Sequence, residues 1–191
     1  MSELLFNELP RPTFRWLRVN HTVSSLAGED TAVQSIAVEA NKNILSPLPV
    51  GTALLDGNYE GANKEAVHVL VEKAEGYAIN VPPKAKEVVG IRIDANARVA
   101  NRFQFIVGEG AELEVQFYVT GSGDALTNVS YLNEYDVKEA GKVVVKKVNL
   151  LPEHVQHIEL PDTLTAILPC WCASALLRWC FCRFCVRADT A

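Results

Sequence analysis

Short apolar stretches separated by Gly, Asn and Pro turns fill the first 160 residues of this chain. Apolar and polar side chains alternate between residues 31 and 45, which predicts a strand there. Residues 51–63 carry Gly and Asn at close intervals, so a loop is expected. Residues 63–74 fit a short helix or a buried strand, and the run from Val67 to Val71 favours the strand.

The pattern becomes regular from Gly76 onward. Short strands separated by corners of small residues are predicted at 78–81, 88–93, 99–107, 113–119, 126–132 and 143–151. The segment 107–115 resembles the segment 137–145 at an offset of 30 residues. A fixed period of this length is typical of architectures built from stacked repeats.

Two architectures fit these strands. One is an antiparallel sandwich or barrel, and the other is a single-stranded parallel β-helix whose coils stack about 4.8 Å apart. The small residues at the corners favour the β-helix, because successive corners lie close together. The hairpin signal is weak, since Asp56-Gly57 is the only such pair. We expect a mainly β fold, with β-helix coils after a small mixed N-terminal region.

The composition changes abruptly near Leu160. Residues 161–191 hold all five cysteines and two of the three tryptophans, with no Gly, Lys or Glu. We therefore divide the chain into a mixed region (1–74), β-helix coils (75–160) and an atypical Cys- and Trp-rich tail (161–191). Such a tail is typical of a shifted reading frame or of a disordered segment.

Charge and hydropathy narrow the range of partners. The net charge of −5 and the lack of a basic face argue against nucleic-acid binding. No apolar stretch reaches the roughly 18 residues of a membrane span, because Arg178 interrupts the stretch from Leu164 to Leu177. Glu3 and Glu8 stand where a secretory signal would be apolar. A cytoplasmic protein without nucleic-acid or membrane partners is expected.

Three segments, Leu9–Asn20, Val107–Leu113 and Lys146–Leu151, carry a resemblance that extends over residues 5 to 159. They resemble the SufB/SufD scaffold proteins of iron–sulfur cluster assembly, and in particular SufD-like members. It implies a right-handed parallel β-helix between an N-terminal region and a C-terminal helical region that binds the ATPase SufC. It also implies that subunits of the SufB and SufD types join through their β-helices, near the place where the cluster assembles.

The same resemblance sets the expected partners and cofactors. It implies a SufC-type ATPase and a SufB/SufD-type partner subunit, with an iron–sulfur cluster held only transiently at the partner interface. Family members are usually much longer, and nothing here resembles the ATPase-binding helices. A truncated and impaired member of the family is therefore expected, with no cofactor of its own.

Metal-ligand motifs are weak in this chain. The tail contains Cys170-x-Cys172 and Cys180-x-Cys182-x-x-Cys185, and only the last pair has useful ligand spacing for zinc or a cluster. His154-x-x-His157 lacks a third ligand at fixed spacing beyond Glu153 or Glu159, and surface histidines are the simpler interpretation. No metal site is expected.

Catalytic motifs are equally scarce. The pairs Gly108-x-Gly110 and Gly121-x-Gly123 lack the following Lys-Ser/Thr of a phosphate-binding loop, so we interpret them as corner glycines. His21 and His68 have no nucleophile arrangement around them. No catalytic residue is assigned, and the chain is not expected to be an enzyme.

Three functional hypotheses remain open. The first is a non-enzymatic scaffold subunit of a Suf-type assembly complex. The second is a carbohydrate-active or cupin-like β protein, which would need converging carboxylates; Glu112, Glu114 and Glu134 are the candidates. The third is a non-functional β-helix fragment.

Overall fold

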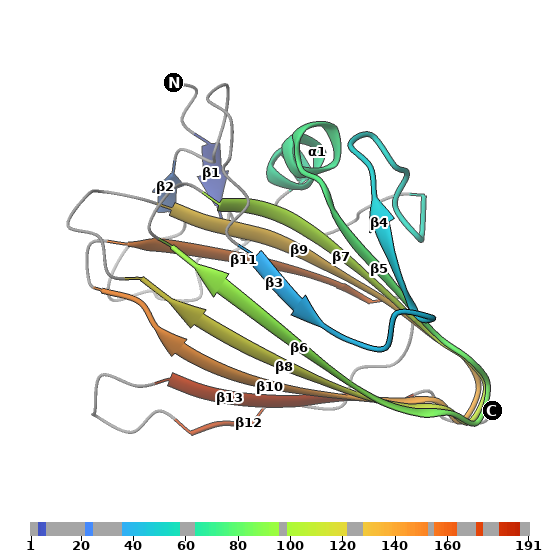
Figure 1. Ribbon diagram of the computed structural model, residues 1–191. Helices are drawn as coiled ribbons and strands as arrows, with labels where there is room; N and C mark the ends of the chain where they lie inside the picture. The colour runs from blue at the N-terminus through green and yellow to red at the C-terminus, as the bar shows by residue number, and fades with distance from the viewer. Residues whose placement is uncertain are drawn as a thin grey trace, which may run out of the picture.

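The computed structural model describes residues 4–6, 22–24, 36–57, 64–95, 99–121, 128–152, 155–163, 171–173 and 180–187. Two β-sheets face each other and converge toward one end of the molecule (Figure 1). The six-stranded sheet contains, in spatial order, β12 (Trp171–Ala173), β13 (Cys180–Arg187), β10 (Lys142–Leu150), β8 (Glu112–Thr120), β6 (Lys86–Asp94) and β3 (Ile36–Glu39).

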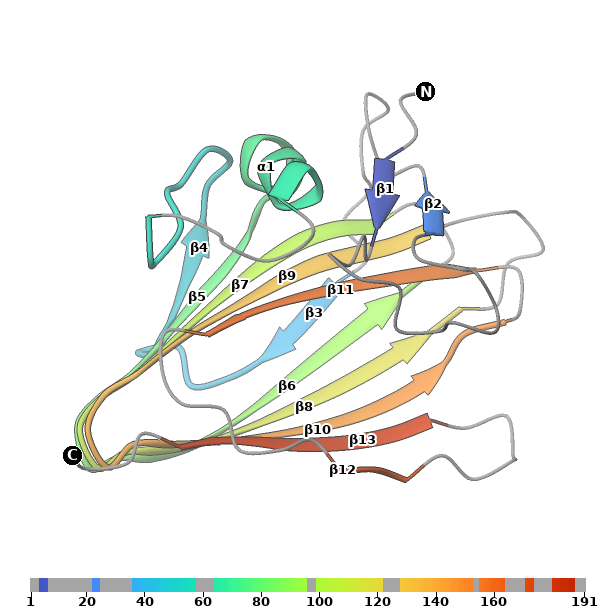
Figure 2. The ribbon, with the colours of Figure 1, turned by 180° about the vertical axis from the view of Figure 1, so that it is seen from behind.

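The five-stranded sheet contains β11 (Gln156–Thr163), β9 (Asn128–Val137), β7 (Val99–Val107), β5 (Gly76–Val81) and β4 (Leu45–Leu48). Helix α1 (Lys64–Lys73) covers the outer side of this sheet, as both views show (Figures 1 and 2). Strands β1 (Leu4–Phe6) and β2 (Thr22–Ser24) form a separate antiparallel pair. The described part of the chain is thus mainly β, as predicted.

Successive strands from β5 to β11 alternate between the two sheets, and within each sheet they pair in parallel. Val107 pairs with Val137 and Glu112 pairs with Lys142, which is the 30-residue offset expected from the sequence. The predicted repeat is therefore confirmed as a structural repeat. Strands β3, β4 and β13 pair antiparallel with their neighbours, so both sheets are mixed.

Three turns connect the two sheets at the convergent end, over residues 82–85, 108–111 and 138–141. In each turn the N–H of the fourth residue donates to the C=O of the first, at N···O distances of 3.2, 3.1 and 2.8 Å. Neighbouring turns are also bonded, because Gly110 N–H donates to Glu139 C=O at 2.9 Å. The turns therefore stack on one another in the same order as the strands they connect.

Close stacking explains why small residues occupy these corners. A Cβ added at Gly108 would lie 2.6 Å from the backbone nitrogen of Pro83 in the neighbouring turn. The interpretation of Gly108 and Gly110 as corner glycines is confirmed. Gly121 directly follows β8, and Gly123 lies outside the described residues.

Aromatic side chains form the centre of the core between the two sheets. Phe105 stacks on Tyr135 with ring centroids 4.9 Å apart, and Phe117 stacks on Tyr131 at 5.5 Å. Phe103 meets Phe117 edge to face at 5.8 Å. All five rings are almost fully buried, and offset or edge-to-face contacts of this kind add stability beyond the buried area.

Residues 64–73 form a helix, so the predicted strand over residues 63–74 is wrong. Ala66, Val67, Leu70 and Ala74 recur at helical spacing and are buried against Ala100, Leu132 and Leu160 on the outer side of the five-stranded sheet. The high β propensity of the Val residues is outweighed by this amphipathic face.

Two predicted strands differ from the observed ones. The segment 31–45 contains β3, a turn over residues 42–44 and the start of β4, and residues 31–35 lie outside the described ranges. The strand expected at 126–132 instead spans Asn128–Val137, and residues 126 and 127 are not described. Its polar second half, around Glu134, is buried.

Candidate functional site

The three carboxylates proposed for a carbohydrate-active site do not converge. Glu112 and Glu114 both lie on β8, where they pair with Lys86 at 3.1 Å and with Lys146 at 2.7 Å. Glu134 lies on β9 in the opposite sheet. Because Glu112 and Glu114 are held in ion pairs with lysines and Glu134 lies in the other sheet, the three carboxylates do not supply the acid and base that glycoside hydrolysis needs.

The Cys and His motifs that the sequence analysis weighed as possible metal ligands do not form a site among the described residues. His154 and Cys170 lie outside the described residues, and of Cys172, Cys180, Cys182 and Cys185 only the strand positions in β12 and β13 are described. His68 is exposed on α1 and lies 3.1 Å from Glu72. Among the described side chains, no group of three His, Cys, Asp or Glu is arranged to hold a metal ion.

A buried ion pair, which the sequence analysis missed, lies on the outer side of the five-stranded sheet. Arg102 Nη2 contacts Glu134 Oε2 at 2.8 Å, and the two side chains are 0% and 1% exposed. Arg102 also donates to the carbonyl of Thr52, and Glu134 accepts the backbone N–H of Leu55. These hydrogen bonds hold the loop of residues 52–55 against the outer side of the sheet. We therefore assign the pair a structural role.

A second polar group lies between the sheets at the β10–β11 end of the core. We call it the interior polar cluster; its members are Tyr131, Asn133, Lys147, Asn149, His157 and Glu159. Lys147 Nζ forms an ion pair with Glu159, whose other oxygen accepts a bond from Asn133 Nδ2 at 2.9 Å. The Lys147 ammonium also lies 5.2 Å from the centroids of Phe117 and Tyr131, which is within cation–π range.

His157 is held inside this cluster by two neutral partners. Its Nε2 lies 3.0 Å from Tyr131 Oη, and its Nδ1 lies 3.0 Å from Asn149 Nδ2. Burial, assisted by the positive charge of Lys147, lowers the pKa of His157 from 6.5 to about 4, although Glu159 opposes this. His157 is therefore neutral near neutral pH. It is half-buried between the sheets and bonded on both ring nitrogens, which differs from the freely exposed surface position expected from the sequence.

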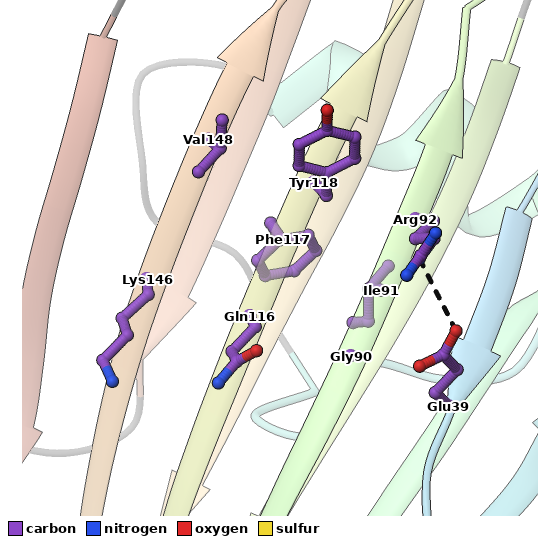
Figure 3. Close-up of a pocket in the computed structure, with 9 residues that line it drawn as sticks. All are labelled: Glu39, Gly90, Ile91, Arg92, Gln116, Phe117, Tyr118, Lys146 and Val148. Atoms are coloured by element: carbon purple, nitrogen blue, oxygen red, sulfur yellow. Dashed lines mark ion pairs between the residues drawn. The ribbon is translucent and has the colours of Figure 1, made fainter.

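An open groove lies on the outer face of the six-stranded sheet, and we call it the outer-face groove. It has a volume of about 610 Å³ and crosses β3, β6, β8 and β10 (Figure 3). Figure 3 shows its polar rim, formed by Glu39, Arg92, Gln116, Tyr118 and Lys146, with Gly90 between them. Arg92 forms an ion pair with Glu39 across the rim at 3.5 Å, and Lys146 pairs at 2.7 Å with Glu114, which does not line the groove.

The free edges of the sheets form the remaining candidate surface. Within the described ranges, β11 pairs only with β9, so its other side carries no strand. The corresponding edge of the six-stranded sheet is occupied, because β13 pairs antiparallel along β10 from Lys142 to Asn149. An unpaired edge strand presents main-chain donors and acceptors that another strand can use.

Comparison of the chain with known protein families, with characterised proteins and with solved structures finds no match. The helix that the structure describes is not long and apolar enough to cross a membrane.

Proposed function

We propose that this chain is a non-enzymatic scaffold subunit of the SufB/SufD type, wound as a right-handed parallel β-helix. The observation that carries the proposal is the ladder of strands and turns. Strands β5 to β11 alternate between two sheets with parallel neighbours, and the turns that connect them stack through backbone hydrogen bonds. The resemblance of Leu9–Asn20 and of Val107–Leu113 to that family supports the same proposal.

The proposed mechanism is positional. Strand β11 offers an edge of eight residues without a strand partner in the described ranges, and a β-helix partner of the SufB/SufD type adds its own strand there. A nascent iron–sulfur cluster is then held transiently at the junction. No phosphate-binding loop occurs in the sequence, so a SufC-type ATPase must supply nucleotide hydrolysis from another chain.

Carbohydrate hydrolysis by Glu112, Glu114 and Glu134 is not supported, because Glu112 and Glu114 on β8 are each paired with a lysine and Glu134 lies in the other sheet. A non-functional fragment is the alternative against which the scaffold proposal is tested.

Co-purification with SufB/SufD-type and SufC-type proteins of the same cell tests the proposal. The full chain and a form ending at Thr163 are compared, because β11 continues to that residue. We expect both forms to retain the partner scaffold, since β13 lies at the other sheet. Loss of every partner from both folded forms would leave the non-functional fragment as the better account.

A further inference from the structure

We propose that the outer-face groove binds a neutral oligosaccharide. This inference goes beyond the scaffold role and does not depend on it, since the groove lies on the face of the six-stranded sheet and β11 belongs to the other sheet. The groove volume of about 610 Å³ lies in the range of small-ligand sites.

The floor of the groove is shaped by a missing side chain. Gly90 lies on β6 beside Gln116 of β8 and opposite Glu39 of β3 (Figure 3). A Cβ built at Gly90 would lie 3.6 Å from Glu39 Cβ, which is ordinary van der Waals contact. Because a side chain fits there without strain, the sheet does not require glycine at this position, and the hollow is free to serve a ligand.

The charges around the hollow favour a ligand without net charge. Arg92 and Lys146 are paired with Glu39 and Glu114, so these two positive and two negative charges offset each other and give little net attraction to a charged ligand. Sugar hydroxyls both donate and accept hydrogen bonds. They can therefore bond to a carboxylate, a guanidinium and the amide of Gln116 while the ion pairs stay intact.

An aromatic ring completes the site. Tyr118 is 43% exposed, although it is a large hydrophobic residue, and it offers an apolar ring with a polar hydroxyl. The C–H face of a pyranose ring can pack on such a ring while its hydroxyls reach the rim.

The groove extends further along the sheet. A second hollow of about 460 Å³ shares Arg92 and Tyr118 with the first and continues toward Ile36 and Thr120. Two adjoining hollows that share one aromatic ring and one guanidinium match the repeating units of an oligosaccharide better than a single small molecule.

Calorimetric titration of the full chain tests the proposal. The probes are neutral hexasaccharides of glucose, mannose, xylose and N-acetylglucosamine, with an oligogalacturonate as the acidic comparison, each at low and at high salt. We expect binding of at least one neutral probe with an affinity that salt does not change, because screening acts only on charged partners.

Variants locate the binding in the groove. Gly90→Val fills the hollow and Tyr118→Ala removes the ring. Each substitution should lower the affinity for the neutral probe by about tenfold or more. Val88→Ala is the matched control, since Val88 is exposed on the same strand but does not line the groove. Tyr118→Phe should retain most of the affinity if the ring provides the contact.

Three results would overturn the inference. They are no binding of any neutral probe, binding of the acidic probe alone with strong salt dependence, and binding that a folded Gly90→Val variant leaves unchanged. Gly90→Val keeps the test valid if Tyr118→Ala fails to fold, because the site at Gly90 accepts a side chain without a close contact.

Discussion

At the scale of single residues, half-buried His157 makes the stability of this protein depend on pH. Its pKa is lowered from 6.5 to about 4 by burial and by Lys147, so between these values the folded protein binds fewer protons than the unfolded chain. Stability is therefore full above pH 6.5 and is lost as the pH falls toward 4. The loss is on the order of 3 kcal/mol, since each pKa unit corresponds to about 1.4 kcal/mol.

Urea unfolding at a series of pH values measures this loss. His157→Gln keeps hydrogen-bonding capacity without a titrating group, and we expect its stability to fall less than that of the wild type over this window. If the unfolding free energy of the two proteins falls equally steeply with pH, groups other than His157 cause the decline.

The Arg102–Glu134 pair gives a second prediction at the residue scale. Both side chains are fully buried, so Glu134→Leu leaves a buried guanidinium without its charge partner and should cost about 3–5 kcal/mol. The double variant Arg102→Met/Glu134→Leu removes both charges and should be less destabilised than Glu134→Leu alone. Arg102→Met is the second single variant. If the double variant loses as much unfolding free energy as the two single variants together, the two residues are not a coupled pair.

At the scale of elements, the three stacked turns share one backbone conformation. The third residue of each turn is left-handed, with φ of 62° at Lys84, 64° at Gly110 and 55° at Ala140. Only the middle turn uses the residue that adopts this conformation without cost. Ala140→Gly should therefore stabilise the protein by about 1 kcal/mol, because a left-handed conformation costs a residue with a Cβ roughly that much.

Thermal unfolding checks this prediction. Ala111→Gly is the control, since Ala111 is the buried fourth residue of the middle turn and is not left-handed. This control should lower the stability. An Ala140→Gly variant less stable than the wild type would contradict the turn geometry.

Strands with one buried face were easier to predict from the sequence than strands buried on both faces. Strands such as β8 were predicted because their inward and outward residues alternate. Strand β9 is buried on both faces, so its polar half around Glu134 gave no alternating signal. For residues 63–74 a helix and a strand were both open from the sequence, and the high β propensity of the Val residues favoured the strand although the spacing of Val67, Leu70 and Ala74 is helical.

The candidate sites were harder to predict than the strands. Lys147 and Glu159 meet only because β10 and β11 lie in opposite sheets that face each other. The outer-face groove unites residues from four strands. Neither site has a local sequence motif, whereas the 30-residue repeat could be recognised from local similarity alone.

At the scale of the whole molecule, the proposed function depends on which edge of the structure receives a partner. Strand β3 is the edge strand on one side of the six-stranded sheet, and toward the other side β13 pairs with β10. Strand β11 is the edge that the scaffold proposal assigns to the SufB/SufD-type partner. Amide hydrogens of β11 should therefore exchange more slowly when the partner is bound, because main-chain hydrogen bonds slow amide exchange.

Hydrogen–deuterium exchange of the full chain, alone and with the SufB/SufD-type partner, tests this account most directly. The scaffold proposal predicts slower exchange in β11 (Gln156–Thr163) when the partner is present, with unchanged exchange in β3 (Ile36–Glu39). Unchanged exchange in β11 in the presence of the partner, or protection confined to β3, would contradict it.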